Sequence, residues 1–214
     1  MYADLVGEAS FWLELREIDR QLQRRTIAAG CLLCGGPLHV ADYPRKPRGI
    51  PVDAEEAFST RFSTCCGHCR RRCTPPSVRF LGRRVYAAAI VVLATMRVLV
   101  CEAAPRTLVR WSGWWTEQLP TMELWRQLCG RLVPAVQVER LPASLLERYE
   151  GRPGAQSRRG LIALLRSLGA LTTQTAERAI DDGSARPSQL TQKMPVDRNG
   201  RALVARAQAP PSET

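Results

Sequence analysis

The sequence predicts a mainly α-helical protein with a small β zinc ribbon, in the order N-terminal helix, ribbon and helical bundle of the helix-turn-helix type. Three observations lead to this prediction: apolar residues recur at helical spacing, two Cys-x-x-Cys motifs are present, and arginines surround the second motif. A chain of 214 residues can bury one sizeable core or hold two small modules. The expected domains are an N-terminal helix at 1–30, a zinc-ribbon module at 31–84, a helical domain at 85–172 and a disordered tail at 173–214.

The centre of the chain is strongly basic. Residues 57–101 contain eight arginines and no aspartate or glutamate, which accounts for +8 of the formal net charge of +11. This balance and a pI near 9.9 indicate an acidic partner, most simply nucleic acid, with an acidic membrane surface as the competing partner. Only two histidines are present, so the sequence offers few candidates for a catalytic histidine.

The first expected element is an amphipathic helix at Phe11–Ala29. Ser10 is its expected N-cap, and Gly30 ends it directly before the first cysteine motif. Its other face mixes glutamates and arginines, which is typical of a solvated surface. The inward positions, at three- and four-residue steps, are Phe11, Leu15, Ile18, Leu22 and Arg25.

The two Cys-x-x-Cys motifs pair Cys31 with Cys34 and Cys66 with Cys69, and 31 residues separate them. Zinc binds four thiolates in a tetrahedron, and a two-residue spacer lets both sulfurs of a tight turn reach one ion. Glycines in and beside the motifs accept positive φ without a steric cost. The sequence therefore predicts a Zn2+ site formed by these four cysteines, with an insertion in the long connection between them.

Other thiols leave the ligand set open at this point. Cys65, His68 and Cys73 are close enough in sequence to replace a ligand of the second motif. The competing interpretations are buried reduced thiols or a disulfide framework, and the latter needs a secreted chain. Neither motif has the strand-to-helix setting of a redox Cys-x-x-Cys. Cys101 and Cys129 lie in apolar surroundings and are expected to be core thiols.

Between the motifs, Pro44, Pro47 and Pro51 exclude a regular helix. The same stretch is basic, which predicts either an arm along a phosphate backbone or a solvated loop. A short helical turn is expected at Asp53–Phe58. The residues of the basic arm are Arg45, Lys46 and Arg48, with His39 and Tyr43.

The most apolar run is Val85–Met96. It is too short to span a bilayer, which takes about 20 residues, and it is therefore expected to be a buried core helix. The residues Met1–Glu8 include acids and lack the basic and apolar regions of a signal peptide. We therefore expect a cytoplasmic protein with no membrane partner.

A further helix is expected from Pro105, because proline suits a first helical turn. Its tryptophan stripe is expected to face the core, whereas its opposite side, near the N-terminal end, presents basic and polar residues as a DNA recognition helix does. The core-facing residues are Leu108, Trp111, Trp115 and Leu119, and the opposite side carries Arg106, Thr107 and Arg110.

Three more helices are expected at 121–132, 141–149 and 157–171, the first capped by Thr121. From about Asp181 the chain is rich in Ala, Arg, Pro, Ser and Gln and has few large apolar residues. Such a composition cannot bury enough surface to offset the entropy of ordering, so this segment is expected to be a disordered tail.

Several stretches together resemble a bacterial family of largely uncharacterised proteins. These proteins are encoded in or near mobile elements, and they resemble the zinc-ribbon and helix-turn-helix parts of insertion-sequence transposases. The resemblance covers roughly residues 10–170. The stretches that carry it are Phe11–Asp19, Ala41–Gly49, Cys69–Arg72, Thr74–Tyr86, Arg110–Trp115 and Leu141–Tyr149.

The resemblance implies that Cys31, Cys34, Cys66 and Cys69 are the ribbon ligands and that Arg106–Trp115 is the DNA-reading helix. The chain departs from the family pattern between residues 96 and 105, where it is short of the usual full helix and turn.

The function expected first is a zinc-dependent DNA-binding accessory protein of a mobile element, associated with a transposase or derived from one. Its partners would be double-stranded DNA and a transposase or another mobile-element protein. The expected nucleic-acid contacts are Arg70, Arg71, Arg72, Arg79, Arg83, Arg84, Arg106, Thr107 and Arg110.

Two other functions compete with DNA binding. A zinc-stapled module for protein or RNA would use an exposed Trp114 and the apolar Val91–Val100 stretch as an interface. A transposase or nuclease would need carboxylates that hold two metal ions. The candidate acids show no recognisable spacing, and we therefore expect a protein that is not an enzyme. These acids are Asp42, Asp53, Glu102, Glu139 and Glu150.

Overall fold

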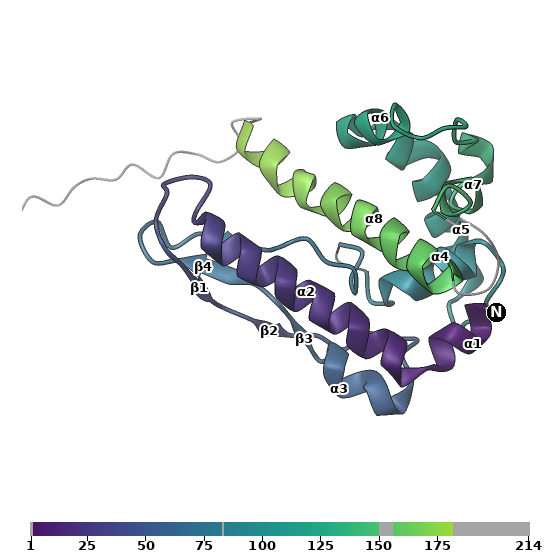
Figure 1. The fold of residues 1–214 in the computed structure, drawn as a ribbon, viewed down its shortest axis with the longest axis horizontal. Helices are drawn as coiled ribbons and strands as arrows, with labels where there is room; N and C mark the ends of the chain where they lie inside the picture. Colours follow the sequence, from purple (N-terminus) through teal and green to yellow (C-terminus); the bar gives the residue numbers. More distant parts are fainter. Residues whose placement is uncertain (1, 83, 150–155, 182–214) are drawn as a thin grey trace, which may run out of the picture. The chain divides into compact units, whose positions relative to one another are not determined.

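The computed structural model describes residues 2–82, 84–149 and 156–181, and residues 1–178 form one compact unit. The second unit is 179–214, of which only residues 179–181 are described. Most of the expected tail therefore lies outside the described residues. Within the described ranges the protein is mainly helical, with small antiparallel sheets, as predicted (Figure 1). The α-helices are α1 (Tyr2–Gly7), α2 (Ala9–Ala29), α3 (Glu55–Phe58), α4 (Ala88–Thr95), α5 (Pro105–Gly113), α6 (Glu123–Cys129), α7 (Ala143–Leu146) and α8 (Gln156–Asp181).

Short strands and single helical turns complete the structure. The strands are β1 (Leu38–Val40), β2 (Tyr43–Pro44), β3 (Thr60–Arg61), β4 (Thr64–Cys66) and β5 (Arg72–Cys73). The 3-10 turns are η1 (Val52–Ala54), η3 (Leu119–Thr121) and η4 (Val138–Arg140), and η2 (Trp114–Gln118) is a π-helical turn.

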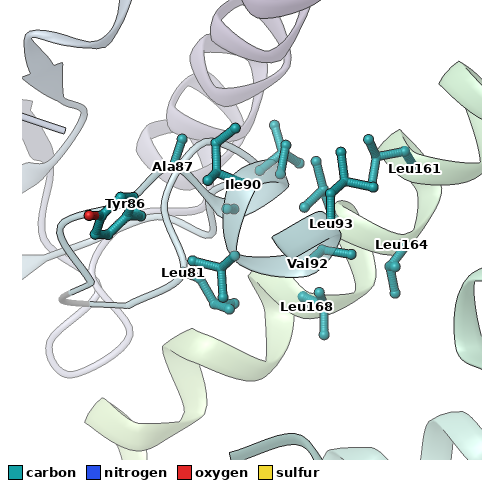
Figure 2. Packing of buried hydrophobic residues seen from close by; sticks show 14 of the residues in the cluster. Leu81, Tyr86, Ala87, Ile90, Val92, Leu93, Leu161, Leu164 and Leu168 are labelled. Carbon is teal, nitrogen blue, oxygen red and sulfur yellow. The ribbon is translucent and has the colours of Figure 1, made fainter. Parts of the chain in front are cut away.

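The main core combines α2, α4 and α8. Every residue of α4 from Ala88 to Ala94 is buried, which confirms the expected core helix. Figure 2 shows side chains of α4 and α8 packed together, among them Leu93 and Leu161, which are both fully buried. Phe11, Trp12 and Leu15 of α2 are also fully buried and join this core. No helix within the described ranges has both the length and the apolar character that a bilayer crossing requires.

Two antiparallel sheets lie between α2 and α4 in the sequence. The three-stranded sheet has the order β1-β4-β5, with Leu38 opposite Cys66 and Thr64 opposite Cys73. The two-stranded sheet pairs Tyr43 of β2 with Arg61 of β3. The second sheet, η1 and α3 form the expected insertion between the cysteine motifs, and α3 confirms the expected short helix there.

A buried ion pair joins α2 to the chain that follows the sheets. Asp19 of α2 accepts hydrogen bonds from the Arg79 guanidinium at 2.8 Å and from the Val78 backbone N–H at 2.7 Å. The Ser77 hydroxyl also donates to this carboxylate. Both charged side chains are fully buried, and the Arg79 guanidinium lies 4.3 Å from the centre of the Phe62 ring. If either Asp19 or Arg79 were removed, the other would be an unpaired charge in an apolar site, which is costly. The pair therefore couples α2 to the chain that follows the sheets.

Helix ends differ from the sequence predictions where side-chain caps were expected. Residue Glu8 is the N-cap of α2, and Ser10 lies inside the helix. In the same way, Met122 rather than Thr121 precedes α6, and neither helix has a side-chain cap. Because backbone and water can also satisfy the first N–H groups of a helix, a hydroxyl residue near the start does not define the boundary.

The expected inward faces are largely correct. Ile18 of α2 is buried and Leu22 is half-buried, but Arg25 is exposed. Trp111 and Trp115 are buried as predicted, although α5 ends at Gly113 and the chain continues through η2 and η3. Residues 96–104 contain no helix.

The last helix, α8, continues to Asp181, past both the expected helix end at 171 and the expected start of the tail at 173. Leu161, Leu164 and Leu168 are fully buried and confirm its predicted apolar face.

Candidate metal centre and basic surfaces

Four cysteine sulfurs meet in one cluster, as the motif spacing predicts. The Sγ atoms of Cys31 and Cys69 are 3.7 Å apart, and those of Cys34 and Cys66 are 3.5 Å apart. All four sulfurs lie within 4.8 Å of one another. Zinc–sulfur bonds of about 2.3 Å place the corners of a tetrahedron about 3.8 Å apart. The four thiols can therefore hold a tetrahedral metal ion.

Each motif is a tight turn closed by backbone hydrogen bonds. In the first, the Gly35 N–H donates to the Cys31 carbonyl at 2.8 Å, and in the second the Arg70 N–H donates to the Cys66 carbonyl at 3.1 Å. The residue after the second cysteine has a left-handed backbone in both turns, with φ of +67° at Gly35 and +59° at Arg70. Glycine adopts this conformation freely, whereas an arginine is strained in it. The two turns thus share one geometry, although only the first has the glycine that it favours.

The backbone of each turn favours a charged sulfur. The N–H groups of Leu33 and Cys34 lower the pKa of the Cys31 thiol to about 6. Burial acts to raise the pKa of Cys66, but the N–H groups of Cys69 and His68 outweigh it and the pKa is lowered.

The pKa of the Cys69 thiol is raised, whereas those of Cys31 and Cys66 are lowered. The Arg71 N–H acts to lower it, but burial and the three neighbouring thiols outweigh this effect and raise it to about 12. Four adjacent thiolates repel one another without a cation, so a bound metal ion displaces the protons that remain.

The structure also separates the four clustered thiols from the other candidate ligands. The Cys65 thiol points to the Arg70 carbonyl at 3.4 Å, outside the group. Burial raises the pKa of Cys73, which lies beside Cys31 and packs against the small apolar cluster below the turns. Among the described residues, only the four clustered cysteines form a group of three or more possible metal ligands.

Close packing behind the turns explains the second glycine of the Cys31-Leu-Leu-Cys34-Gly-Gly sequence. A Cβ atom at Gly36 would lie 2.7 Å from Nδ1 of His68 and 3.1 Å from the Cys66 sulfur. Gly67 is equally restricted, because a Cβ atom there would lie 2.9 Å from Nε2 of His39. Sequence analysis did not identify this packing role, although consecutive glycines after a cysteine motif were a signal for it.

The arginines of the second turn fall into two groups. Arg70 and Arg71 are exposed, and no carboxylate pairs with them within the described part of the chain. Arg72 is exposed too, but its guanidinium donates to the Ala41 carbonyl and to the Ser63 hydroxyl. The side chains of Arg70 and Arg71 make no described hydrogen bond, whereas the side chain of Arg72 also stabilises the neighbouring strands.

The prediction that Arg79 contacts nucleic acid is wrong. Its side chain has no exposed surface, because it pairs with Asp19 inside the core. Arg61, also counted in the basic segment, is buried beside the same carboxylate at 3.8 Å. Part of the arginine-rich segment thus has an internal role. Arg83 lies outside the described residues.

The remaining predicted contacts lie on or near α5. Arg106 and Arg110 are exposed on this helix, and Thr107 is half-buried. Arg84 is half-buried, with its guanidinium carbon 4.6 Å from the centre of the Trp114 ring. The exposed members of the predicted contact set are therefore Arg70, Arg71 and Arg72 in the second turn and Arg106 and Arg110 on α5.

Among the described residues, the features expected of the competing functions are not brought together, and no group of three or more acids is placed to hold metal ions. Trp114, expected to be exposed, is buried against Trp115, and Val91 lies in the core, although Val100 is exposed. Asp42 is engaged by Gln23 and by the Ser63 N–H, so this candidate acid supports the sheet. Glu150 lies outside the described residues.

Comparison with known proteins identifies no relative of this chain. No family model, curated protein or solved structure matches the chain. The function is therefore inferred from the thiol cluster and the arginines themselves.

Proposed function

We propose that this chain is a zinc-dependent DNA-binding protein, in which the metal holds the thiol-bearing turns in place and arginines bind the DNA backbone. The observation that carries the proposal is the cluster of four thiols with sulfur contacts of 3.5 and 3.7 Å, two of which, Cys66 and Cys69, lie in the segment that carries +8 of the net charge. The cluster supports the metal, and the charge supports the partner.

Zinc fits this set of ligands best. An all-thiolate tetrahedral set favours Zn2+ or an iron–sulfur centre over the hard cations Mg2+ and Ca2+, which prefer oxygen. Four protein ligands leave no open position for a substrate or water, which is typical of a structural site. Bound zinc would neutralise thiolate charge at Cys31, Cys34, Cys66 and Cys69 and would contribute directly to the stability of the folded state.

Duplex DNA fits the distribution of charge. Exposed arginines with no carboxylate partner among the described residues lie in the second turn, at Arg70 and Arg71, and on α5, at Arg106 and Arg110. Each arginine that meets a phosphate releases condensed counterions, and such contacts supply most of the affinity of a nonspecific complex. Contacts with base edges by α5 would add sequence preference.

The family resemblance extends the proposal to a biological setting. A DNA-binding protein of this kind would act beside a transposase or another mobile-element protein, on DNA at or near the element. This part of the proposal rests on the quoted sequence stretches alone.

The test is the affinity of the zinc-loaded protein for DNA across a salt series, with and without a chelator. A random duplex, the DNA that flanks the gene and a single-stranded RNA of equal length would be compared by fluorescence anisotropy. We expect affinity that falls steeply with salt, is lost with the chelator and is highest for the flanking DNA. Equal or tighter binding to the RNA, or no binding to either duplex, would contradict the proposal.

A further inference from the structure

Three basic segments that are far apart in the sequence converge near α5. The Arg48 N–H donates to the Val85 carbonyl at 3.0 Å, and the Ala87 N–H donates to the Arg48 carbonyl at 3.2 Å. The basic arm therefore runs beside the chain that leads into α4. The Arg45 guanidinium adds a third bond, to the Arg84 carbonyl at 2.8 Å.

The side chain of Arg84 is held in place. Its guanidinium lies over the Trp114 ring at 4.6 Å and donates to the Leu81 carbonyl at 3.2 Å. Arg110 precedes Trp114 by four residues on the continuous helical stretch of α5 and η2, and residues at this spacing lie on the same face. The guanidinium of Arg84 is thereby placed beside Arg110.

This group of cations has no described counterion. No carboxylate of the described residues lies within 4.0 Å of Arg45, Arg84 or Arg110. Burial first, and then the charge of Arg110, lower the pKa of Arg84. Arg79 differs from these arginines, because the buried carboxylate of Asp19 neutralises its charge. Like charges held together without a carboxylate form a site that an anion stabilises.

We propose that Arg84 and Arg110 form one phosphate-binding cluster that holds the DNA backbone against α5. This inference rests on the proposed function and names the part of the surface that carries it. A guanidinium group binds phosphate oxygens through two parallel N–H bonds, and stacking on an aromatic ring reduces the freedom that it loses on binding. Arg106, one turn before Arg110, extends the cluster along the helix.

The test compares Arg84→Gln and Arg110→Gln with the control Arg25→Gln in the full-length, zinc-loaded protein. Arg25 is exposed on α2 and belongs to no described arginine cluster, so the control removes the same charge elsewhere. Circular dichroism shows whether each variant is folded. Arg110 is exposed and makes no described side-chain hydrogen bond, so its variant keeps the test valid if Arg84→Gln is unstable.

Two readouts separate this inference from the proposed function. The first is the slope of log affinity against log salt for a random DNA duplex. The second is the rise in melting temperature that inorganic pyrophosphate produces. We expect each cluster variant to reduce the salt slope by about 0.9, the value for one lost phosphate contact, and Arg25→Gln to leave it unchanged.

The outcomes are distinct. If the wild-type protein binds duplex DNA and the cluster variants keep its salt slope, the inference is overturned while the proposed function stands. If pyrophosphate stabilises the wild type and the control but neither cluster variant, and duplex DNA does not bind at all, the cluster is a phosphate site and the proposed DNA function fails. A reduced slope in both cluster variants supports both statements.

Discussion

The helical core and the thiol-bearing sheet of this protein differ in what holds them together. The core of α2, α4 and α8 is built from large apolar side chains, of which Phe11, Trp12 and Leu93 are fully buried. Below the thiol turns, the buried apolar cluster contains only Cys31, Leu38 and Cys66 among the described residues. Burial of apolar area stabilises the first region, whereas the second has little of it, and we propose that a metal ion held by the four thiols stabilises it instead.

The comparison also shows that arginine has different roles in the two regions. Arg79 is buried with a counterion and ties α2 to the chain that follows the sheet. Arg70 and Arg71 are exposed at the thiol turn. A single basic segment of sequence thus contributes both to internal stability and to the exposed basic surface of the thiol turn.

The largest expected effect is the loss of a thiol ligand. Cys66→Ser removes a buried sulfur of the cluster, so we expect zinc content to fall from one ion per chain to none and DNA affinity to fall with it. Zinc content is measured by atomic emission and affinity by anisotropy. Cys129→Ser is the matched control, because this thiol packs at the edge of the helical core and is far from the motifs in sequence. Equal losses in both variants would remove the proposed difference between the regions.

The next effect concerns the buried ion pair. Asp19→Ala leaves Arg79 charged and without its partner inside the protein, which costs about 3–5 kcal/mol of unfolding free energy. Urea denaturation of the zinc-loaded protein measures it. The control is Glu17→Ala, which breaks an exposed pair with Arg24 that solvent screens, so its loss should change the unfolding free energy little. Similar costs for the two variants would show that the buried pair does not fix α2 to the rest of the protein.

The smallest effect tests the strain in the second thiol turn. Arg70→Gly relieves a left-handed arginine, and we expect a gain of about 1 kcal/mol in the unfolding free energy of the zinc-loaded protein. Arg71 has no positive φ, so Arg71→Gly removes the same charge but costs about 0.5–1 kcal/mol through backbone entropy. Urea denaturation of both variants gives the comparison. A loss of stability in Arg70→Gly would show that the turn is not strained.

Local sequence patterns predicted the thiol cluster and the buried helix well. The spacing of Cys31 with Cys34 and of Cys66 with Cys69 is a property of two short turns, and the apolar run of α4 has no polar face to expose. Such features depend on neighbours within a few residues, and the sequence displays those neighbours directly.

Features that depend on distant partners were not predictable in this way. Arg79 lies in a basic segment and is expected at the surface, but its partner Asp19 is far away in sequence. One signal was present, because Asp19 follows Leu15 by four residues and therefore lies on the apolar face of α2. The burial of Trp114 also had a signal in the sequence, because it follows the buried Trp111 by three residues and so lies on the same helical face.

Amide hydrogen exchange, with and without a chelator, tests the central claim most directly. We predict that the chelator removes protection from β1, β4, β5 and the two thiol turns, while α4 and the part of α8 that packs against it stay protected. Unchanged protection of the sheet would contradict the account, because the thiol region would then be stable without metal. Loss of protection throughout both regions would also contradict it, because the helical core would then depend on the same ion.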